Sequence, residues 1–286
     1  MKQENISYTI AKSSMIYELK KLWKLVFGDS ESYINLFFEH RFVPAQTMVA
    51  LYDGVPIGML FLLPITLKAE SCDYNARYIY AVGTHPAYRS QGVSGRLLEA
   101  THARLQAEGV ALSLLVPAEP SLFDYYGARG FETEFYCSDA HYNADLQAKP
   151  AELRIASLPD LLRLRDRSFS QSQLYARWDR EALDYQQKET ALMGGETLHF
   201  LFPQEGYAVC YPTEEVIFIK EWGAPALYPE ILDAIAARYN CRNIHLRLAA
   251  DFDARYSPKP FAMTRWYLTE RTAQTGKAPY LALVLD

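Results

Sequence analysis

The run Arg89-Ser90-Gln91-Gly92-Val93-Ser94-Gly95 has residue types that could bind a phosphate group. It precedes an expected helix, and the first turn of a helix offers unpaired backbone N–H groups and the positive end of the dipole. Gly92 and Gly95 would let the backbone approach phosphates closely, and Arg89 can add a charge-assisted contact. The run matches neither a Walker loop nor a dinucleotide-binding loop, which disfavours nucleotide hydrolysis. Taken alone, it could also be an ordinary strand-to-helix turn whose glycines serve packing.

Segments on both sides of this loop have the hydrophobic periodicity of regular secondary structure. Apolar residues recur at helical spacing in some segments and form β-branched runs in others, and Asp53-Gly54 is typical of a tight hairpin turn. The expected helices are residues 13–27, 30–42, 93–108 and 120–130, and the expected strands are 47–53, 55–67, 76–85, 110–117 and 131–136. This order predicts a mixed α/β domain in which strand 76–85 leads into the loop.

The second half of the sequence broadly repeats this order. Its expected helices are residues 158–169 and 229–239, and its expected strands are 198–203, 206–212, 214–222, 243–248 and 279–286. A length of 286 residues is enough for two ordinary domains. We therefore expect two domains, residues 1–146 and 151–286, with a linker between them and with related α/β folds built on mixed sheets.

Two motifs make the first half resemble the GNAT superfamily of N-acetyltransferases. The family signature Arg/Gln-x-x-Gly-x-Gly/Ala is matched by the run Arg89 to Ser94, with serine at the second small position. The family's aromatic-Tyr pair and following Gly-aromatic pair are matched by Tyr125-Tyr126 and Gly130-Phe131. The resemblance implies transfer of an acetyl group from acetyl-CoA directly to a primary amine. The implied CoA-binding residues are Val82, Gly83, Thr84, Arg89, Ser90, Gln91, Gly92, Val93, Ser94, Gly95 and Tyr125.

The resemblance also implies roles for individual groups near the thioester. Main-chain groups of Val82 and Thr84 would bind the pantetheine arm, as an open strand edge can bind an extended ligand. Tyr126 would protonate the departing CoA thiolate. A phenol suits this role because its pKa of about 10 keeps it protonated at neutral pH.

The sequence offers two candidates for the general base that deprotonates the amine. The expected strand 76–85 has Tyr78 and Tyr80 where some GNAT enzymes supply a carboxylate. Glu119 follows the next strand and could act directly or through water. The terminal carboxylate at Asp286 is the second candidate, because a tandem arrangement can direct the last strand inward.

An intact GNAT half followed by a half without the loop resembles the tandem acetyltransferases of the enhanced intracellular survival type, without their sterol-carrier-like domain. After strand 214–222, Pro225 and Pro229 leave few free amides at the start of the next helix. We therefore expect one CoA site per chain and a degenerate second domain. That domain would shape the substrate pocket or form the interface of a homo-oligomer.

Composition bounds the partners further. The net charge of −5 and the absence of a basic patch argue against nucleic acid, and no apolar run approaches the ~20 residues that span a bilayer. The N-terminus lacks the pattern of a signal peptide, so we expect a cytoplasmic protein without membrane contact. The scattered cysteines and histidines form no ligand spacing, and no metal is expected. The expected partner is a small-molecule or peptide amine.

Two other functions fit parts of the sequence. A non-catalytic acyl-CoA-sensing or scaffold protein would also need the loop, with the second half as its interaction module. Aminoacyl transfer of the peptidoglycan type also uses paired GNAT-like halves. The intact Arg89 loop favours CoA over a charged tRNA donor, and the acidic chain lacks an RNA-binding pattern.

Overall fold

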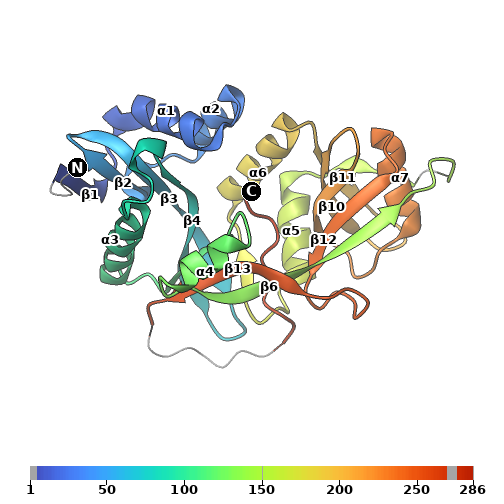
Figure 1. Ribbon diagram of the computed structural model, residues 1–286. Coiled ribbons are helices and arrows are strands. Elements are labelled where there is room, and N and C mark those ends of the chain that lie inside the picture. The colour runs from blue at the N-terminus through green and yellow to red at the C-terminus, as the bar shows by residue number, and fades with distance from the viewer. Residues whose placement is uncertain (1–4, 150, 269–275, 286) are drawn as a thin grey trace.

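The computed structural model describes residues 5–149, 151–268 and 276–285. Within these ranges the strands form one mixed sheet of 13 strands, with helices on its faces, which confirms the expected α/β class (Figure 1). The order across the sheet is β1-β2-β3-β4-β5-β13-β6-β12-β11-β10-β9-β7, and β8 pairs with β3 outside this path. The two halves of the sequence therefore share a single continuous sheet.

The first half contains the expected elements and one strand more. Its helices are α1 (Ile16–Phe27), α2 (Glu31–His40), α3 (Val93–Ala107) and α4 (Ser121–Gly127). Its strands are β1 (Ile6–Ile10), β2 (Thr47–Tyr52), β3 (Val55–Lys68), β4 (Asp73–Thr84), β5 (Leu112–Leu115) and β6 (Glu132–Asn143). The hairpin turn expected at Asp53-Gly54 joins β2 to β3, and both residues have positive φ. The five-residue β1 was not expected.

The second half differs more from expectation. Its helices are α5 (Leu158–Phe169), α6 (Arg180–Leu192) and α7 (Pro229–Tyr239). Its strands are β7 (Arg154–Ile155), β8 (Tyr175–Arg177), β9 (Glu196–Phe200), β10 (Gly206–Pro212), β11 (Ile217–Trp222), β12 (Asn243–Ala249) and β13 (Lys259–Trp266). Helix α6 and strands β7, β8 and β13 were not expected. They prove important for how the two halves meet.

Strand β13 crosses from the second half of the sequence into the sheet of the first. It pairs antiparallel with β5 on one edge and with β6 on the other (Figure 1). The far end of β6 pairs in turn with β12 of the second half. The largest hydrophobic core likewise combines side chains of both halves. The division into residues 1–146 and 151–286 stays a proposal about two halves that share one sheet and one core.

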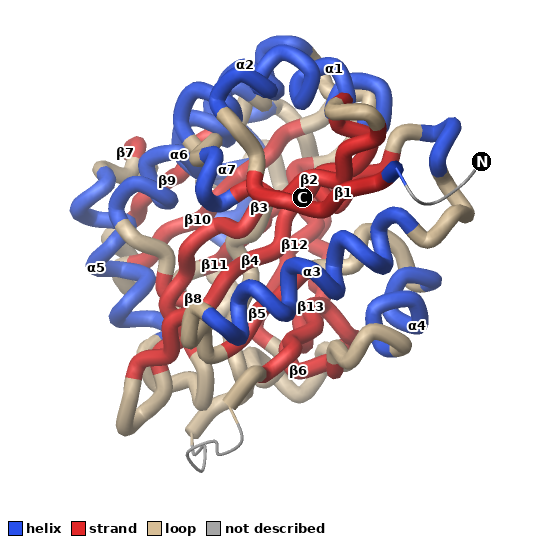
Figure 2. The backbone as a smooth tube through the Cα atoms, turned by 90° about the vertical axis from the view of Figure 1, so that its left-hand side faces the viewer, coloured by secondary structure: helices blue, strands red, loops and turns tan. Residues whose placement is uncertain are grey.

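Helices cover the strands of the first half on both faces. Figures 1 and 2 show α1 and α2 on one side of β1–β4 and α3 on the other. Side chains alternate along β4 accordingly: Tyr78 and Tyr80 belong to the core beneath α1 and α2, whereas Ile79 belongs to the core beneath α3. This alternation decides which face of β4 each candidate group reaches.

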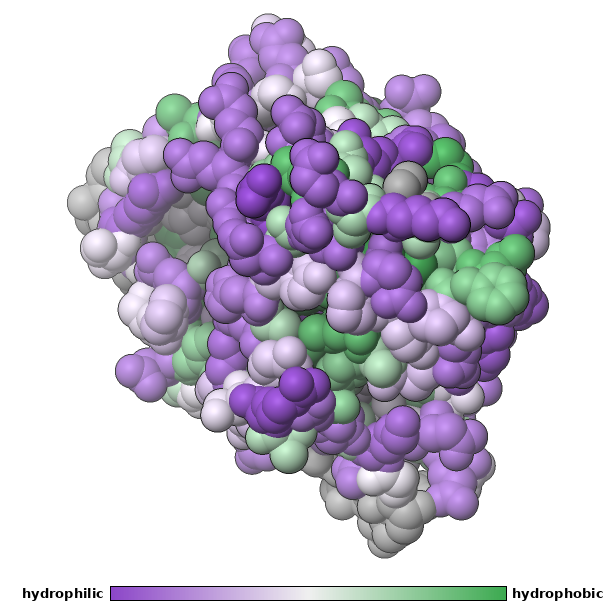
Figure 3. All heavy atoms as spheres, turned by 90° about the vertical axis from the view of Figure 1, so that its right-hand side faces the viewer, coloured by the Kyte–Doolittle hydropathy of each residue, from purple (hydrophilic) through white to green (hydrophobic). Residues whose placement is uncertain are grey.

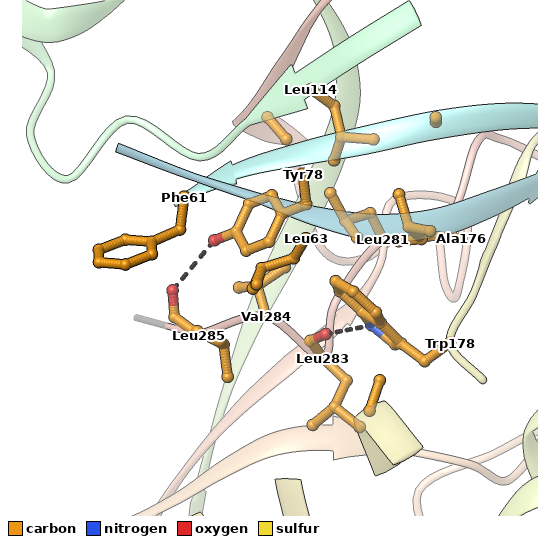
Figure 4. Close-up of a cluster of buried hydrophobic side chains, with 14 of the residues drawn as sticks. Phe61, Leu63, Tyr78, Leu114, Ala176, Trp178, Leu281, Leu283, Val284 and Leu285 are labelled. Carbon is orange, nitrogen blue, oxygen red and sulfur yellow. Dashed lines mark hydrogen bonds between the residues drawn. The ribbon is translucent and has the colours of Figure 1, made fainter. Parts of the chain in front are cut away.

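Residues 276–285 end the described part of the chain in an extended segment between the halves, and the segment is buried from Tyr280 onward. Sequence periodicity predicted a strand here, but the segment makes isolated bridges at Lys277 and Tyr280 and is otherwise held by side chains. Trp178 Nε1 donates to the Leu283 carbonyl at 2.6 Å, and Tyr78 Oη donates to the Leu285 carbonyl at 3.0 Å (Figure 4). The segment is thereby fixed beside β4.

The surface gives less direct information. The face on the α7 side is largely hydrophilic, and its hydrophobic side chains lie in several separate areas (Figure 3). Among the described residues no helix has the length and apolar character needed to cross a membrane. Because the hydrophobic side chains on the α7 side lie in separate areas, this face does not identify an interface, and the homo-oligomer remains a proposal.

Candidate active site

The Arg89 loop forms the turn before α3, as expected. Ser90 and Gly92 have φ values of 60° and 75°, a left-handed backbone that glycine adopts without a steric cost. The first bond of the helix runs from Arg96 N to Gly92 O, so the N–H groups of Val93, Ser94 and Gly95 precede the intrahelical ladder. These groups point out of the helix start, where an anion can bind.

A cavity of about 360 Å³ lies at this helix start. It is lined by Thr84, Tyr88, Arg89, Ser90, Gly92, Val93, Ser94, Tyr125 and Arg129. Seven of these nine residues were predicted from the sequence to bind CoA, and Tyr88 and Arg129 were not. Two arginines and a helix N-terminus give the cavity a positive potential, which suits a pyrophosphate.

Arg129 is the main residue that sequence reasoning missed. Its guanidinium carbon lies 3.5 Å from the centroid of the Tyr125 ring, and its Nη1 donates to the Tyr125 carbonyl at 2.6 Å. A Cβ on Gly95 would lie 3.2 Å from Arg129 Nη2, so the glycine gives this arginine its space. The signal was available, because Arg129 lies inside the second motif between Tyr126 and Gly130.

Ser94 has a role that a glycine or alanine could not fill. Its Oγ lies 2.5 Å from the Tyr125 hydroxyl, which ties the start of α3 to α4. Gln91 and Gly95 do not line the cavity: the Gln91 side chain donates to the Ala87 carbonyl within the loop, and Gly95 packs against Arg129. These two residues shape the loop more than they face a ligand.

Strands β4 and β5 part immediately before this cavity. Their parallel pairing ends at Tyr78 opposite Leu114, so β4 continues for six more residues without β5 beside it. Val82 is partly exposed there. The buried Thr84 Oγ1 has no hydrogen-bond partner among the described residues, and a ligand at the strand end would satisfy it. Gly83 instead faces α1, where a Cβ would lie 3.3 Å from the Phe27 ring.

Tyr126 lies in α4 and is 7% exposed. Its ring packs edge-on against Tyr125 and Phe131 at centroid distances of 5.2 and 5.8 Å. Burial, reinforced by the neighbouring Tyr125, raises the pKa of Tyr126 to about 12. The phenol therefore stays protonated over the whole range in which enzymes are assayed, as a proton donor requires.

The structure describes one of the two candidates for the general base, Glu119. Glu119 is exposed, and its carboxylate accepts from Ser121 in its own turn at 2.6 Å. Asp286 lies outside the described residues. Its neighbour Leu285 is buried and bonded to Tyr78 on the α1–α2 face of β4 (Figure 4).

The second half has no comparable loop where β11 ends. Parallel pairing of β11 with β12 stops at Ile219 opposite Leu246, but α7 begins with Pro229 and has no side-chain cap. A Cβ on Gly223 would lie 1.8 Å from the Tyr207 ring, so aromatic side chains occupy this position. One CoA site per chain remains our prediction.

Comparisons with known proteins concern the first half of the sequence and the fold of the chain. Residues 7–133 match the family model described as an acetyltransferase (GNAT) domain. Among curated proteins, none matches the chain. A GCN5-related N-acetyltransferase from Anabaena variabilis has 17% identity and a TM-score of 0.71, and the alignment covers 92% of this chain and 73% of that one.

Two further solved structures share the fold over both halves of the chain. A probable N-acyltransferase from Enterococcus faecalis has 16% identity and a TM-score of 0.68, and Eis1 from Mycobacterium abscessus has 12% and 0.62. Each alignment covers 92% of this chain and 73% of the other. These matches fit the tandem arrangement expected from the sequence. Residues 7–133 thus match an acetyltransferase (GNAT) domain, and the fold of the chain is shared with solved N-acyltransferase structures.

Proposed function

We propose that the protein transfers an acetyl group from acetyl-CoA to a primary amine in a ternary complex. The observation that carries this proposal is the cavity at the start of α3, which extends to Thr84 at the open end of β4. A helix start that can bind phosphate lies beside an unpaired strand end, and these two features match the pyrophosphate and the pantetheine arm of CoA.

Each part of acetyl-CoA has a proposed partner. The pyrophosphate binds the N–H groups at the start of α3, with Arg89 and Arg129 above it. Main-chain groups of Val82 and Thr84 bind the pantetheine arm where β5 has left β4. The ordering of donor and amine in one site supplies much of the rate enhancement.

The chemical step is a direct displacement at the thioester carbonyl. The amine nitrogen forms the new C–N bond, the C–S bond breaks, and the backbone N–H of Val82 stabilises the oxyanion of the intermediate. Tyr126 gives its proton to the departing thiolate and is reprotonated by the proton that leaves the nitrogen. CoA and an N-acetylated product result.

This proposal is tested by calorimetry with acetyl-CoA and by CoA release with a panel of spermidine, kanamycin, lysine and a lysine-containing peptide. We expect one acetyl-CoA per chain and turnover with at least one amine. Binding without turnover across the panel would favour the sensing or scaffold alternative. No binding of acetyl-CoA would reject both.

Arg129→Ala is expected to raise the KM for acetyl-CoA about tenfold with little change in kcat. One charge-assisted contact in a partly exposed site contributes about 1.4 kcal/mol, which is a factor of ten. Steady-state kinetics with varied acetyl-CoA measure the change. Arg242→Ala is the control, because Arg242 is exposed in the second half. An equal rise in both variants would argue against a phosphate contact.

A further inference from the structure

Three polar side chains form a hydrogen-bonded row across the junction of the two halves. The hydroxyl groups of Tyr33 on α2 and Tyr80 on β4 lie 2.8 Å apart. The Tyr33 hydroxyl also donates to Oε1 of Glu189 on α6, at 3.0 Å. The row therefore joins β4, which leads to the proposed CoA site, to a carboxylate of the second half.

Glu189 has the least exposed surface of the three side chains in this row. Glu189 is 2% exposed, whereas Tyr33 and Tyr80 keep part of their surface in solvent. A buried carboxylate is costly unless several donors satisfy it. Tyr211 on β10 supplies another, since its hydroxyl donates to Glu189 Oε2 at 3.1 Å.

The carboxylate fixes the direction of every bond in the row. An ionised carboxylate accepts only, and a phenol has a single hydrogen. Tyr33 gives its hydrogen to Glu189 and must therefore accept from Tyr80. The oxygen of Tyr80 then keeps a lone pair for a further donor. Burial raises the pKa of both phenols above the ordinary value, so both remain hydrogen-bond donors.

Other titratable groups surround the carboxylate. Tyr185 lies one turn earlier on α6, and burial together with the nearby Glu189 raises the pKa of its phenol. Lys220 on β11 lies 4.6 Å from the centroid of the Tyr211 ring. Arg41, just after α2, is coupled to Tyr185 electrostatically. Lys220 and Arg41 are thus cations that face the tyrosines around this carboxylate.

Tyr80 is well placed for an amine that attacks the thioester. It precedes Val82 by two residues on β4, where the chain bends at Ala81 with a φ of 50°. Its ring faces α1 and α2, whereas Tyr126 belongs to the core on the α3 face. An amine beside Tyr80 would thus approach from the side of the sheet opposite the proposed acid.

We propose that Glu189 is the positioning residue through which the acceptor ammonium loses its proton, acting by way of Tyr33 and Tyr80. This inference rests on the proposed acetyl transfer and specifies its acceptor as a cationic amine. One N–H proton of the ammonium passes to the Tyr80 oxygen as the Tyr80 proton passes to Tyr33 and the Tyr33 proton to Glu189. The free amine then attacks. After the product leaves, Glu189 returns the proton to solvent along the same row.

Glu189→Gln tests the proposal, because an amide keeps an acceptor for Tyr33 but cannot take the proton. With spermidine or the most active amine of the panel, we expect kcat to fall about 100-fold, within the usual range for proton transfer. The rate should then rise with pH until the amine itself deprotonates near pH 10. The KM for acetyl-CoA should stay within about twofold of wild type, because the row does not contact the cavity at α3.

Two tyrosine variants separate a proton path from a structural role. Tyr33→Phe interrupts the row and should reproduce the loss of Glu189→Gln, with no further loss in the double variant. Tyr211→Phe removes an equal bond to Glu189 outside the row and should cost less than about threefold. A wild-type pH profile in Glu189→Gln, or equal losses in both tyrosine variants, would overturn the proposal. An inert wild type that still binds acetyl-CoA would instead refute the acetyl transfer itself.

Discussion

Tyr126→Phe is expected to lower kcat by about 100-fold to 1,000-fold and to leave the affinity for acetyl-CoA unchanged, within the range for loss of a general acid. The ring of Tyr126 is buried between Tyr125 and Phe131, so phenylalanine fits the same space. The loss would therefore report the missing proton and not a repacked core. Single-turnover formation of CoA thiol measures it.

The pH dependence of the wild-type enzyme gives a second check on Tyr126. Because burial raises the pKa of Tyr126 to about 12, its proton is retained as the pH rises, and wild-type kcat should not fall between pH 8 and 10 through this group. A phenol with an ordinary pKa would be half deprotonated at about pH 10. A decline centred near pH 10 would contradict the assignment.

Tyr8→Phe is the matched control for Tyr126→Phe. The hydroxyl of Tyr8 is buried in the same half without a hydrogen-bond partner among the described residues, so its removal should change neither stability nor rate appreciably. If both variants lose activity equally, the hydroxyl of Tyr126 is not the proton donor.

The turn and helix of the proposed CoA loop could be predicted from the sequence because the signals for them are local. Gly92 requires a left-handed backbone, and the helix that follows has a clear apolar face, so turn and helix can be read from adjacent residues. The Asp53-Gly54 hairpin was predictable for the same reason. Arg129 also lay within a motif, but its contact with the helix start depends on the space left at Gly95.

Features that join distant segments could not be predicted in this way. Strand β13 begins with Lys259-Pro260, and nothing in its own residues indicates that it lies between β5 and β6. Helix α6 is largely polar in sequence, and its buried face includes Glu189 and a glutamine beside its apolar residues. The spacing of its apolar residues alone therefore did not indicate a helix. Glu189 was missed as a consequence. Its partners are 156 and 22 residues away in sequence, and the row exists only once the halves meet.

The same nonlocal packing produces a fully buried ion pair in the second half. Arg165 on α5 and Glu221 on β11 are 1% and 0% exposed, and Arg165 Nε lies 2.9 Å from Glu221 Oε2. Tyr207 and Tyr280 also donate to Glu221, at 2.7 and 3.1 Å. Burial alone would lower the pKa of Arg165, but Glu221 raises it well above the ordinary value. The Arg165 guanidinium is therefore held in its charged form, and it donates to Glu221 and to the Tyr175 hydroxyl.

Arg165→Met is expected to lower the free energy of unfolding by about 3–5 kcal/mol, because it leaves the Glu221 carboxylate buried without its cation. The midpoint of thermal unfolding should fall by roughly 10 °C. Urea denaturation followed by tryptophan fluorescence measures the change. Arg163→Met is the control: its partner is Glu205, Arg163 is 50% exposed, and the expected cost is below about 1 kcal/mol.

The double variant Arg165→Met/Glu221→Leu distinguishes an unpaired charge from lost packing. If the unpaired carboxylate is the cause, removing it should restore much of the stability, as replacing a whole buried pair is often neutral. A double variant less stable than either single one would contradict this reasoning.

Tyr280 belongs to the buried segment that continues to Leu285 beside Tyr78, so loss of its bond to Glu221 should also loosen that segment. Activity would then fall at temperatures below the unfolding transition, which links a structural ion pair of the second half to the proposed site of the first.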